Sequence, residues 1–584
     1  MSGGLMQLVA YGAQDVYLTG NPQITFFKVA YRRHTNFAMQ AMTVVASGAS
    51  GFDKVMNFTI PRNGDLIMNT YLKAEIKAVP ASDKKFAFVK RLGHALIDYI
   101  TLTIGGSQID KQYGMWLDLW YELTHTKSQE KGYKQMIGEV PELTKMTSAG
   151  KKGYMLFVPL QFWFCRNPGL ALPLIALQYH EVKVELKTAR KEELICYESG
   201  FETSEAFKSI ELGDVSLLVN YVFLDSEERR KFAQVGHEYL IEQVQFTGSV
   251  PLPTASADSR TEVHHAVQLN FNHPSKELVW AVRNGLTRGN KFLTYTADED
   301  WSVAIDEAAD KIIDASTRIL TTGEAQVVEG AVKTEETFAA ADWFIVKDGE
   351  LYELTGDVKV EFTNGIATTQ TPKFDTVIST EKSTLDMQIS LLDTELTDIV
   401  LIKKGTAKLA DGTDLFAKIH AVEISKTLGA NVINHSLTVA DVSVPLSSWS
   451  SSAGIDGVVV NIPFNYGMFI DGSGNPVTKG LIQFNGQDRF DEREGMFFNC
   501  VQPLQHHTCS PADGVNVYSF AINPENHQPS GSANLSRIDT TYLQLRYKGA
   551  PTGYFSASSQ LFVFDFSYNV LRVMSGMGGL AYSN

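Results

Sequence analysis

Residues 181–187 read EVKVELK and residues 541–547 read TYLQLRY, and these two short runs decide the class of fold. In both runs apolar side chains alternate with charged or polar ones, the pattern of a β-strand with one buried and one wet face. Phe562, Phe564 and Phe566 alternate in the same way within LFVFDFSYNV. Clusters of Pro, Gly and Asn separate such runs along the chain. The pattern predicts an all-β protein built of sandwiches or barrels.

The same order of strand signals occurs twice along the chain. Each half has a strand that enters a tight turn, then an aromatic strand, an alternating strand and a closing strand. The matched pairs are ITLTIGGSQID (100–110) with GLIQFNGQDRF (480–490), YMLFVPLQFWF (154–164) with VYSFAIN (517–523), EVKVELK with TYLQLRY, and VSLLVNYVFLD (215–225) with LFVFDFSYNVLRV (561–573). Four matched signals in one order predict two tandem β-units.

A long insertion separates two strands of the second unit. One strand, KELVWAVRN, ends at Asn284, and the next does not begin until Gly480. The first unit makes the same crossing between Lys77 and His94. We place the insertion between the fourth and fifth strands of the second unit. Because a loop of such length without structure of its own is uncommon, we expect the insertion to fold independently.

The insertion is expected to be β-rich, and it is acidic. The dipeptides Asp348-Gly349 and Asn364-Gly365 are typical of tight β-hairpin turns. Residues 291–450 contain 27 acidic and 13 basic residues, a net charge of −14 out of −15 for the whole chain. The rest of the chain is therefore nearly neutral. Nucleic-acid binding needs concentrated Lys and Arg to replace counterions, so the composition argues against direct contact with a genome.

The composition is that of an ordinary globular protein. The chain has 584 residues, of which 44 % are hydrophobic and 20 % charged, and its length favours two or three domains. No run of eighteen apolar residues occurs, so no membrane-spanning helix is predicted. The cysteines are Cys165, Cys196, Cys500 and Cys509, and none forms a CxxC pair. We expect reduced thiols and an intracellular site of folding.

No catalytic residue, cofactor site or metal site is predicted. Cys500, His506, His507 and Cys509 lie close together and include zinc-ligand types, but their spacing fits no familiar zinc finger. The glycines form neither a P-loop nor a GxGxxG turn, and no GxSxG elbow occurs. Of three N-x-S/T strings, the one at Asn434 is the best exposed candidate for glycosylation.

Residues 12–38 read GAQDVYLTGNPQITFFKVAYRRHTNFA. The breaker Gly20-Asn21-Pro22 precedes an apolar run, which by itself indicates a turn leading into a strand. A basic cluster of Arg32, Arg33 and His34 follows. The stretch has no long apolar run after a basic start, so it is not expected to be a signal peptide.

The stretch at 12–38 closely resembles the amino-terminal arm of the major capsid proteins of nucleocytoplasmic large DNA viruses, with the algal phycodnavirus-type proteins as the nearest match. Further segments resemble the same family, in family order. They are residues 167–187, 223–249, 269–280, 484–490, 528–539 and 568–584. The resemblance covers all of the chain except the insertion, in which we find no family motif.

The resemblance implies a double jelly roll, that is, two tandem eight-stranded antiparallel jelly rolls, with a β-rich inserted domain in the second. It implies no enzyme activity but a structural role in the capsid of a virion, where homotrimers form pseudo-hexagonal capsomers that tile an icosahedral shell over an inner membrane. Minor capsid and penton proteins are the further partners implied, and synthesis and assembly are expected in the host cytoplasm. The insertion is expected on the outer face.

The expected domain boundaries follow from the strand patterns and from the family resemblance together. They are an N-terminal arm at 1–25, the first jelly roll at 26–224, a connector at 225–238, the second jelly roll at 239–284 and 480–584 including the C-terminal tail, and the inserted surface domain at 285–479. The arm is expected to run under the shell and contact neighbouring subunits or minor capsid proteins. Arg32, Arg33 and His34 are candidates for contacts between subunits, although a solvated basic turn is equally open.

An alternative from another class is a β-sandwich carbohydrate-binding or glycan-processing protein, with the insertion as its active module. Exposed aromatic residues beside paired carboxylates would be its signature. Trp343 and Tyr352 do occur near acidic residues.

Overall fold

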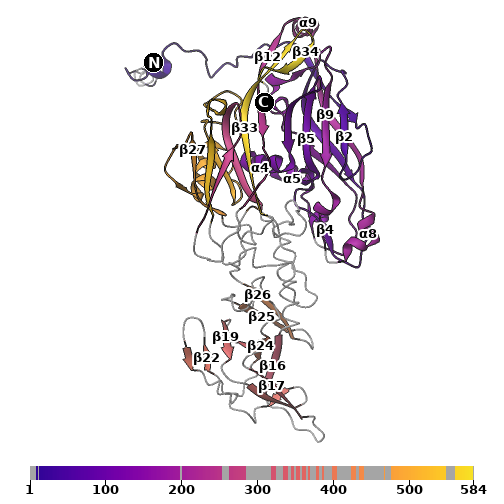
Figure 1. Cartoon of the computed structure of the whole chain (residues 1–584), viewed down its shortest axis with the longest axis vertical. Coiled ribbons are helices and arrows are strands. Elements are labelled where there is room, and N and C mark those ends of the chain that lie inside the picture. Colours follow the sequence, from indigo (N-terminus) through magenta and orange to yellow (C-terminus); the bar gives the residue numbers. More distant parts are fainter. Residues whose placement is uncertain are drawn as a thin grey trace.

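A computed structural model gives the arrangement of the chain (Figure 1). It describes residues 12–145, 147–197, 200–252, 262–283, 475–547 and 559–582, with Leu8, Ala10, Ala339 and Tyr466, and the backbone of strands between 317 and 439. Two β-units lie side by side, and the strands of the insertion lie beyond one end of them (Figure 1).

The first unit is a sandwich of two antiparallel sheets. One sheet has the strand order β1-β11-β3-β7, and the other has the order β2-β9-β5-β6. Their bounds are β1 (Phe37–Val45), β2 (Val55–Thr59), β3 (Leu66–Ile76), β5 (Ile97–Ile104), β6 (Ser107–Tyr113), β7 (Tyr154–Pro159), β9 (Val182–Thr188) and β11 (Leu212–Leu224). The strand β9 contains residues 182–187 of the EVKVELK run, and its Val and Leu side chains are buried as the alternation predicts.

The second unit repeats this topology strand for strand. Its sheets have the orders β12-β33-β15-β30 and β14-β32-β27-β28. Their bounds are β12 (His237–Gln245), β14 (Val263–Leu269), β15 (Pro274–Arg283), β27 (Val477–Phe484), β28 (Gln487–Asp488), β30 (Val515–Ser519), β32 (Thr541–Tyr547) and β33 (Gln560–Met574). Two sandwiches with this shared eight-strand order confirm the predicted double jelly roll and all four matched pairs of the duplication.

The turns after β5 and β27 show the duplication at the level of single residues. Gly105 and Gly106 have φ values of 59° and 84°, and Asn485 and Gly486 have φ values of 51° and 77°. Positive φ at both central residues defines the hairpin turn that matches the twist of the flanking strands, and Gly and Asn adopt it most easily.

The insertion follows β15 and contains eleven described strands. They are β16 (Thr317–Gly323), β17 (Lys333–Phe338), β18 (Trp343–Lys347), β19 (Glu350–Leu354), β20 (Val358–Thr363), β21 (Ile366–Thr368), β22 (Val377–Ser379), β23 (Thr384–Asp386), β24 (Asp398–Lys403), β25 (Val422–Leu428) and β26 (Ile433–Val439). Both predicted hairpins are confirmed, because β18 pairs with β19 and β20 pairs with β21, each antiparallel. Of the eight strands that both units share, the insertion follows the third, β15, and precedes the fourth, β27, so the predicted position between the fourth and fifth strands is wrong by one strand.

Short elements complete the two units. The helices are α3 (Leu92–Leu96), α4 (Gly114–Thr124), α5 (Lys127–Met136), α6 (Pro141–Thr144), α7 (Trp163–Arg166), α8 (Glu205–Lys208), α9 (Ser226–Gln234), the π-helical turn η7 (Phe497–Val501) and α11 (Gln502–His506). The minor strands are β4 (Phe86–Phe88), β8 (Leu172–Pro173), β10 (Ile195–Tyr197), β29 (Arg493–Glu494), β31 (Ala533–Asn534) and β34 (Met577–Leu580).

The strand predicted after Gly20-Asn21-Pro22 is wrong. The arm forms the short helix α2 (Val16–Thr19) and then extended chain, and the first strand begins only at Phe37. A strand needs a neighbouring strand for its backbone hydrogen bonds, and the apolar run Ile24–Val29 has none among the described residues.

The two units are joined by α4, which leaves the end of β6 and packs on the β12-β33-β15-β30 sheet. Trp116 lies 5.6 Å from Phe564 between ring centroids, and Trp120 lies 5.1 Å from Phe566. Every residue of α4 from Gly114 to Leu123 is buried. A helix that is apolar on nearly all sides is stable only inside a core, so α4 belongs to both units at once.

Gly114 permits the close approach that starts this helix. A Cβ at this position would lie 2.2 Å from the carbonyl oxygen of Ile97 and 2.3 Å from that of His94. Those oxygens belong to the backbone and cannot give way easily, so any larger residue would displace the beginning of α4.

We predict that Trp116→Ala lowers the free energy of unfolding by about 3–5 kcal/mol, because it removes a buried indole and leaves a cavity between the units. Urea unfolding monitored by circular dichroism measures the effect. Tyr17→Ala is the control: Tyr17 is 94 % exposed, so its loss should change stability by no more than about 0.5 kcal/mol. Equal stability of the two variants would contradict the role given to α4.

Candidate assembly surfaces

The N-terminal arm is an apolar segment that the body of the chain does not cover. Among the described residues, its exposed large apolar side chains are Leu8, Val16, Tyr17, Leu18, Ile24, Phe26, Phe27, Val29 and Tyr31. Phe27 is 98 % exposed. The hydrogen bonds that residues 12–35 make with described residues stay within the arm, and the arm leads away from both units (Figure 1). Exposed apolar patches of this kind mark surfaces of protein interaction.

Arg32, Arg33 and His34 lie together where the arm meets β1, and all three are exposed. The Nδ1 atom of His34 is 2.7 Å from the carbonyl oxygen of Thr35, and its ring lies 5.7 Å from that of Phe37. Neither arginine has an acidic partner within the described part of the chain. Contact of this cluster with another subunit remains a prediction.

A buried ionic cluster, which was not predicted from the sequence, involves Asp118 and Glu122 of α4. Arg91 donates to Asp118 at 2.7 Å and to Glu139 at 3.2 Å, and it also pairs with Glu122. The Tyr466 hydroxyl donates to Asp118 at 2.5 Å. Burial would raise the pKa of Asp118, but the charge of Arg91 outweighs it and holds that pKa well below its usual range. The Arg91 cluster thus connects α4 with the chain that returns from the insertion.

A second buried ionic cluster crosses the boundary between the units. Arg166 of the first unit pairs with Glu242 of the second, with 2.9 Å between Nη2 and Oε2. Lys276, which is fully buried, also donates to Glu242. Burial lowers the pKa of Lys276, and the charge of Glu242 opposes that shift. Removing Glu242 would take this carboxylate from the buried Lys276 and the partly buried Arg166, so this cluster fixes how the units are joined.

The four residues with zinc-ligand types do not come together. His507 bonds to Glu277 at 2.8 Å and Glu525 at 3.1 Å, whereas His506 bonds to the carbonyl oxygen of Ile522. The Cys509 thiol lies 3.5 Å from Nε2 of His125, and the Cys500 thiol bonds to Asn499. Within the described residues no group of three or more potential ligands could hold a metal ion. All four cysteines of the chain are free thiols in the structure.

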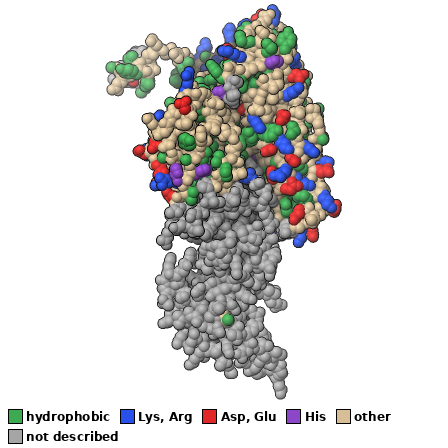
Figure 2. Space-filling model, viewed as in Figure 1, with side chains coloured by type: hydrophobic (Ala, Val, Ile, Leu, Met, Phe, Trp, Pro, Cys, Tyr) green, Lys and Arg blue, Asp and Glu red, His purple; other side chains and the backbone are tan. Residues whose placement is uncertain are grey.

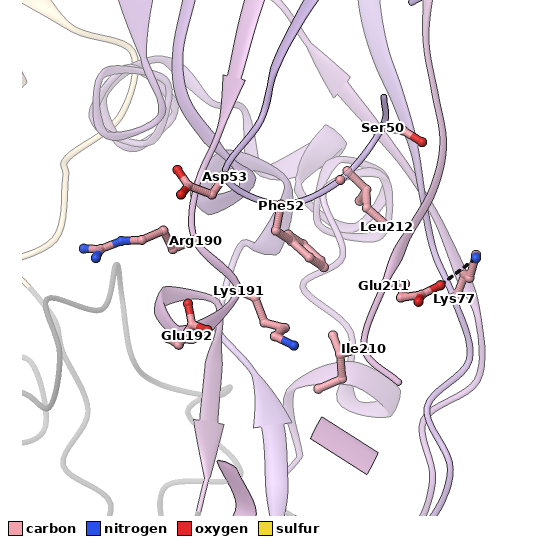
Figure 3. A pocket seen from close by; sticks show the side chains of 11 residues that line it. Ser50, Phe52, Asp53, Lys77, Arg190, Lys191, Glu192, Ile210, Glu211 and Leu212 are labelled. Atoms are coloured by element: carbon pink, nitrogen blue, oxygen red, sulfur yellow. Dashed lines mark hydrogen bonds and ion pairs between the residues drawn. The ribbon is translucent and has the colours of Figure 1, made fainter. Parts of the chain in front are cut away.

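An open cavity of about 620 Å³ lies at one end of the first unit, beside β9 and β11 (Figure 3). Its charged side chains are of both signs: Lys77, Arg190 and Lys191 against Asp53, Glu192 and Glu211. Lys77 and Glu211 pair with each other at 2.8 Å. A cavity with balanced charge gives no preference for an anionic or a cationic ligand.

The distribution of charged side chains on the surface agrees with the charge counts of the sequence. On the face shown in Figure 2, basic and acidic side chains are interspersed over the first unit, without a broad basic area. In the parts of the chain that are described, every helix is too short or too polar to cross a lipid bilayer. Asn434 belongs to β26, and Trp343 and Tyr352 belong to β18 and β19, but their side chains lie outside the described residues.

Comparisons with known proteins agree with the topology. Residues 25–225 match the family described as major capsid protein N-terminus, and residues 228–579 match the family described as large eukaryotic DNA virus major capsid protein. The chain is 41 % identical to capsid protein 1 of Acanthamoeba polyphaga mimivirus and 38 % identical to the major capsid protein of Phaeocystis pouchetii virus, with 100 % of each chain covered.

The fold is similar to that in a quasi-atomic model of the PBCV-1 virus capsid, with a TM-score of 0.57 and 27 % identity over 96 % of this chain and 100 % of that one. These similarities do not favour the carbohydrate-binding alternative.

The stability of the protein should depend on pH through the protonation of the buried His507. Burial lowers its pKa, but Glu277 and Glu525 outweigh this and raise the pKa from 6.5 to about 9. A histidine with a raised pKa adds stability below the pKa of the unfolded chain, and it loses that contribution as the pH rises from about 6.5 to about 9. We predict that His507→Gln costs about 3 kcal/mol at pH 6 and much less at pH 9.5.

Urea unfolding at a series of pH values measures this difference. His264→Gln, an exposed histidine on β14, is the matched control and should keep the pH profile of the unsubstituted protein. A constant difference between His507→Gln and the unsubstituted protein from pH 6 to 9.5 would mean that His507 is not held protonated.

Proposed function

The chain belongs to the family of large eukaryotic DNA virus major capsid proteins, and from that premise we propose that three copies form a pseudo-hexagonal capsomer. As a major capsid protein it is a component of the virion capsid. We propose that its role is structural and that it catalyses no reaction. Capsomers of this kind would then tile an icosahedral shell.

The shared topology of the two units is the observation that carries this proposal. Each chain contributes two sandwiches with the same strand order, so a trimer would present six similar edges. A threefold assembly can then occupy a lattice position that has nearly sixfold surroundings. Nothing in this argument depends on the insertion.

We also propose that the insertion at 285–479 faces outward and the arm faces inward. The strands of the insertion lie beyond one end of the two units, whereas the arm leaves near the opposite end (Figure 1). The net charge of −14 over residues 291–450 suits an outer surface, because repulsion between like-charged particles opposes their association.

The arm at residues 1–25 is proposed to contact neighbouring capsomers or minor capsid and penton proteins under the shell. Its exposed apolar side chains, among them Tyr17 and Leu18, need a partner, and the described body of the chain does not supply one. Contact with an inner membrane would be indirect, and no direct contact with nucleic acid is proposed. We propose that assembly takes place in the host cytoplasm.

Light scattering of the purified chain tests the trimer. Three chains of 64.6 kDa give about 194 kDa, and this mass should persist on dilution to micromolar concentrations. A stable monomer of 64.6 kDa under the same conditions would contradict the proposal.

Deletion of residues 1–25 should leave the trimer intact but abolish or strongly reduce its assembly into shells, because the arm reaches away from the units. Electron microscopy counts shells, and light scattering gives the mass of the capsomer. A deletion variant that forms shells with unchanged yield would show that the arm makes no required contact.

A further inference from the structure

The β12-β33-β15-β30 sheet of the second unit and its equivalent in the first unit, the β1-β11-β3-β7 sheet, differ in how other parts of the chain cover them. In the second unit, the outward side of the β12-β33-β15-β30 sheet presents Val279, Val517 and Phe564, which belong to the core that also contains α4. Trp116 of α4 packs directly on Phe564. This sheet is therefore hidden within the chain, and the element that hides it is the connection between β6 and β7 of the other unit.

Among the described residues, the β1-β11-β3-β7 sheet of the first unit is covered at one end only, where Leu66 and Val222 pack with Phe232 of α9. Tyr71, Phe157 and Leu218 are partly exposed, and each alternates along its strand with fully buried neighbours. Tyr71 lies opposite Leu218 in the register of β3 and β11, so the two side chains share one face of the sheet. The edge strand β1 is exposed at most of its positions, whereas its equivalent, β12, is buried over Ile241–Val244.

The second unit carries a counterpart of α4, which among the described residues packs on Trp280 and β30 of its own unit. The segment from Met496 to His506, comprising η7 and α11, connects β29 to β30, as α4 and its loop connect β6 to β7. Its inner side is fixed: Phe498 packs on Trp280 at 5.2 Å, and Asn499 donates to the carbonyl oxygen of Val515 at 2.9 Å.

The outer side of this segment is apolar and open to solvent. Met496, Val501 and Leu504 are 69 %, 38 % and 78 % exposed. In the first unit the equivalent connection instead presents Trp116 and Trp120, which are 1 % and 6 % exposed because the second unit receives them. Large exposed apolar side chains grouped on one short segment indicate a surface of protein interaction. We therefore expect this segment, like α4, to pack against another surface.

From this asymmetry we propose that Met496, Val501 and Leu504 dock on the β1-β11-β3-β7 sheet of a second copy of this chain. The contact repeats between chains the arrangement that α4 makes within one chain. It rests on the proposed trimer and names the surfaces that hold the trimer together. Each copy docks its own segment on one neighbour, and its sheet binds the segment of another neighbour. A head-to-tail contact of this kind forms a closed ring when the rotation between copies permits closure.

The equivalence of the two units also predicts which strands meet in the contact between copies. Within the chain, β6 lies against the edge strand β12, where the backbone N–H of Val244 donates to Asp110 at 3.2 Å and Gln243 donates to the carbonyl oxygen of Ile109. The counterpart of β6 is β28, and the counterpart of β12 is β1. The turn at β28 should therefore lie along the exposed edge of β1 in the next copy.

Leu504→Asp tests the proposal, because a side chain that is 78 % exposed in the monomer can be changed without disturbing the fold. We expect this variant to remain folded by circular dichroism and to dissociate at concentrations at least tenfold above those at which the unsubstituted trimer dissociates. Leu18→Asp is the matched control: Leu18 is 87 % exposed in the arm, and its variant should stay trimeric.

Crosslinking identifies the receiving surface. With p-benzoylphenylalanine in place of Leu504, ultraviolet light should link the segment to peptides of β1, β3, β7 or β11 in another copy, as read by mass spectrometry. A trimeric Leu504→Asp variant with unchanged dissociation, or crosslinks confined to other peptides, would overturn the docking surface but leave the trimer standing. If the unsubstituted protein is itself monomeric, the proposed trimer fails and the docking surface fails with it.

Discussion

The packing of α4 between the two jelly rolls is the contact on which the rest of the structure depends. Trp116 and Trp120 leave the first unit and enter the face of a sheet in the second, where Phe564 and Phe566 receive them. Neither side of this contact would be stable in water alone, because both expose large aromatic surfaces. The chain therefore behaves as one body with two similar halves, and a trimer needs that rigidity to place six similar edges.

Buried charge makes this junction specific. Apolar packing alone tolerates sliding, whereas the pairs Arg166–Glu242 and Arg91–Asp118 require one relative placement of the segments that carry them. Buried ion pairs contribute little net stability, but breaking one leaves an uncompensated charge. The role of the Arg166–Glu242 pair is therefore to select one arrangement of the two units, whereas the Arg91 cluster fixes α4 within the first unit and connects it to Tyr466.

Much of the fold could be predicted from the sequence, because strand alternation and tight turns are local signals. The duplication, the Gly105-Gly106 and Asn485-Gly486 turns and the hairpins of the insertion all follow from short runs of residues. The strand expected in the arm failed because a strand also needs a neighbour, which no local pattern reports. The Arg91 cluster was missed for a related reason: Arg91, Asp118 and Tyr466 are far apart in the chain, and only the folded topology brings them together.

The measurement that tests this account most directly is an electron cryomicroscopy reconstruction of the purified assembly. The account predicts three chains whose six jelly rolls form one ring, with the segment at 496–506 of each chain seated on the β1-β11-β3-β7 sheet of the next. A ring in which that sheet faces solvent and the chains meet through other surfaces would contradict the claim that the contact within the chain is repeated between chains.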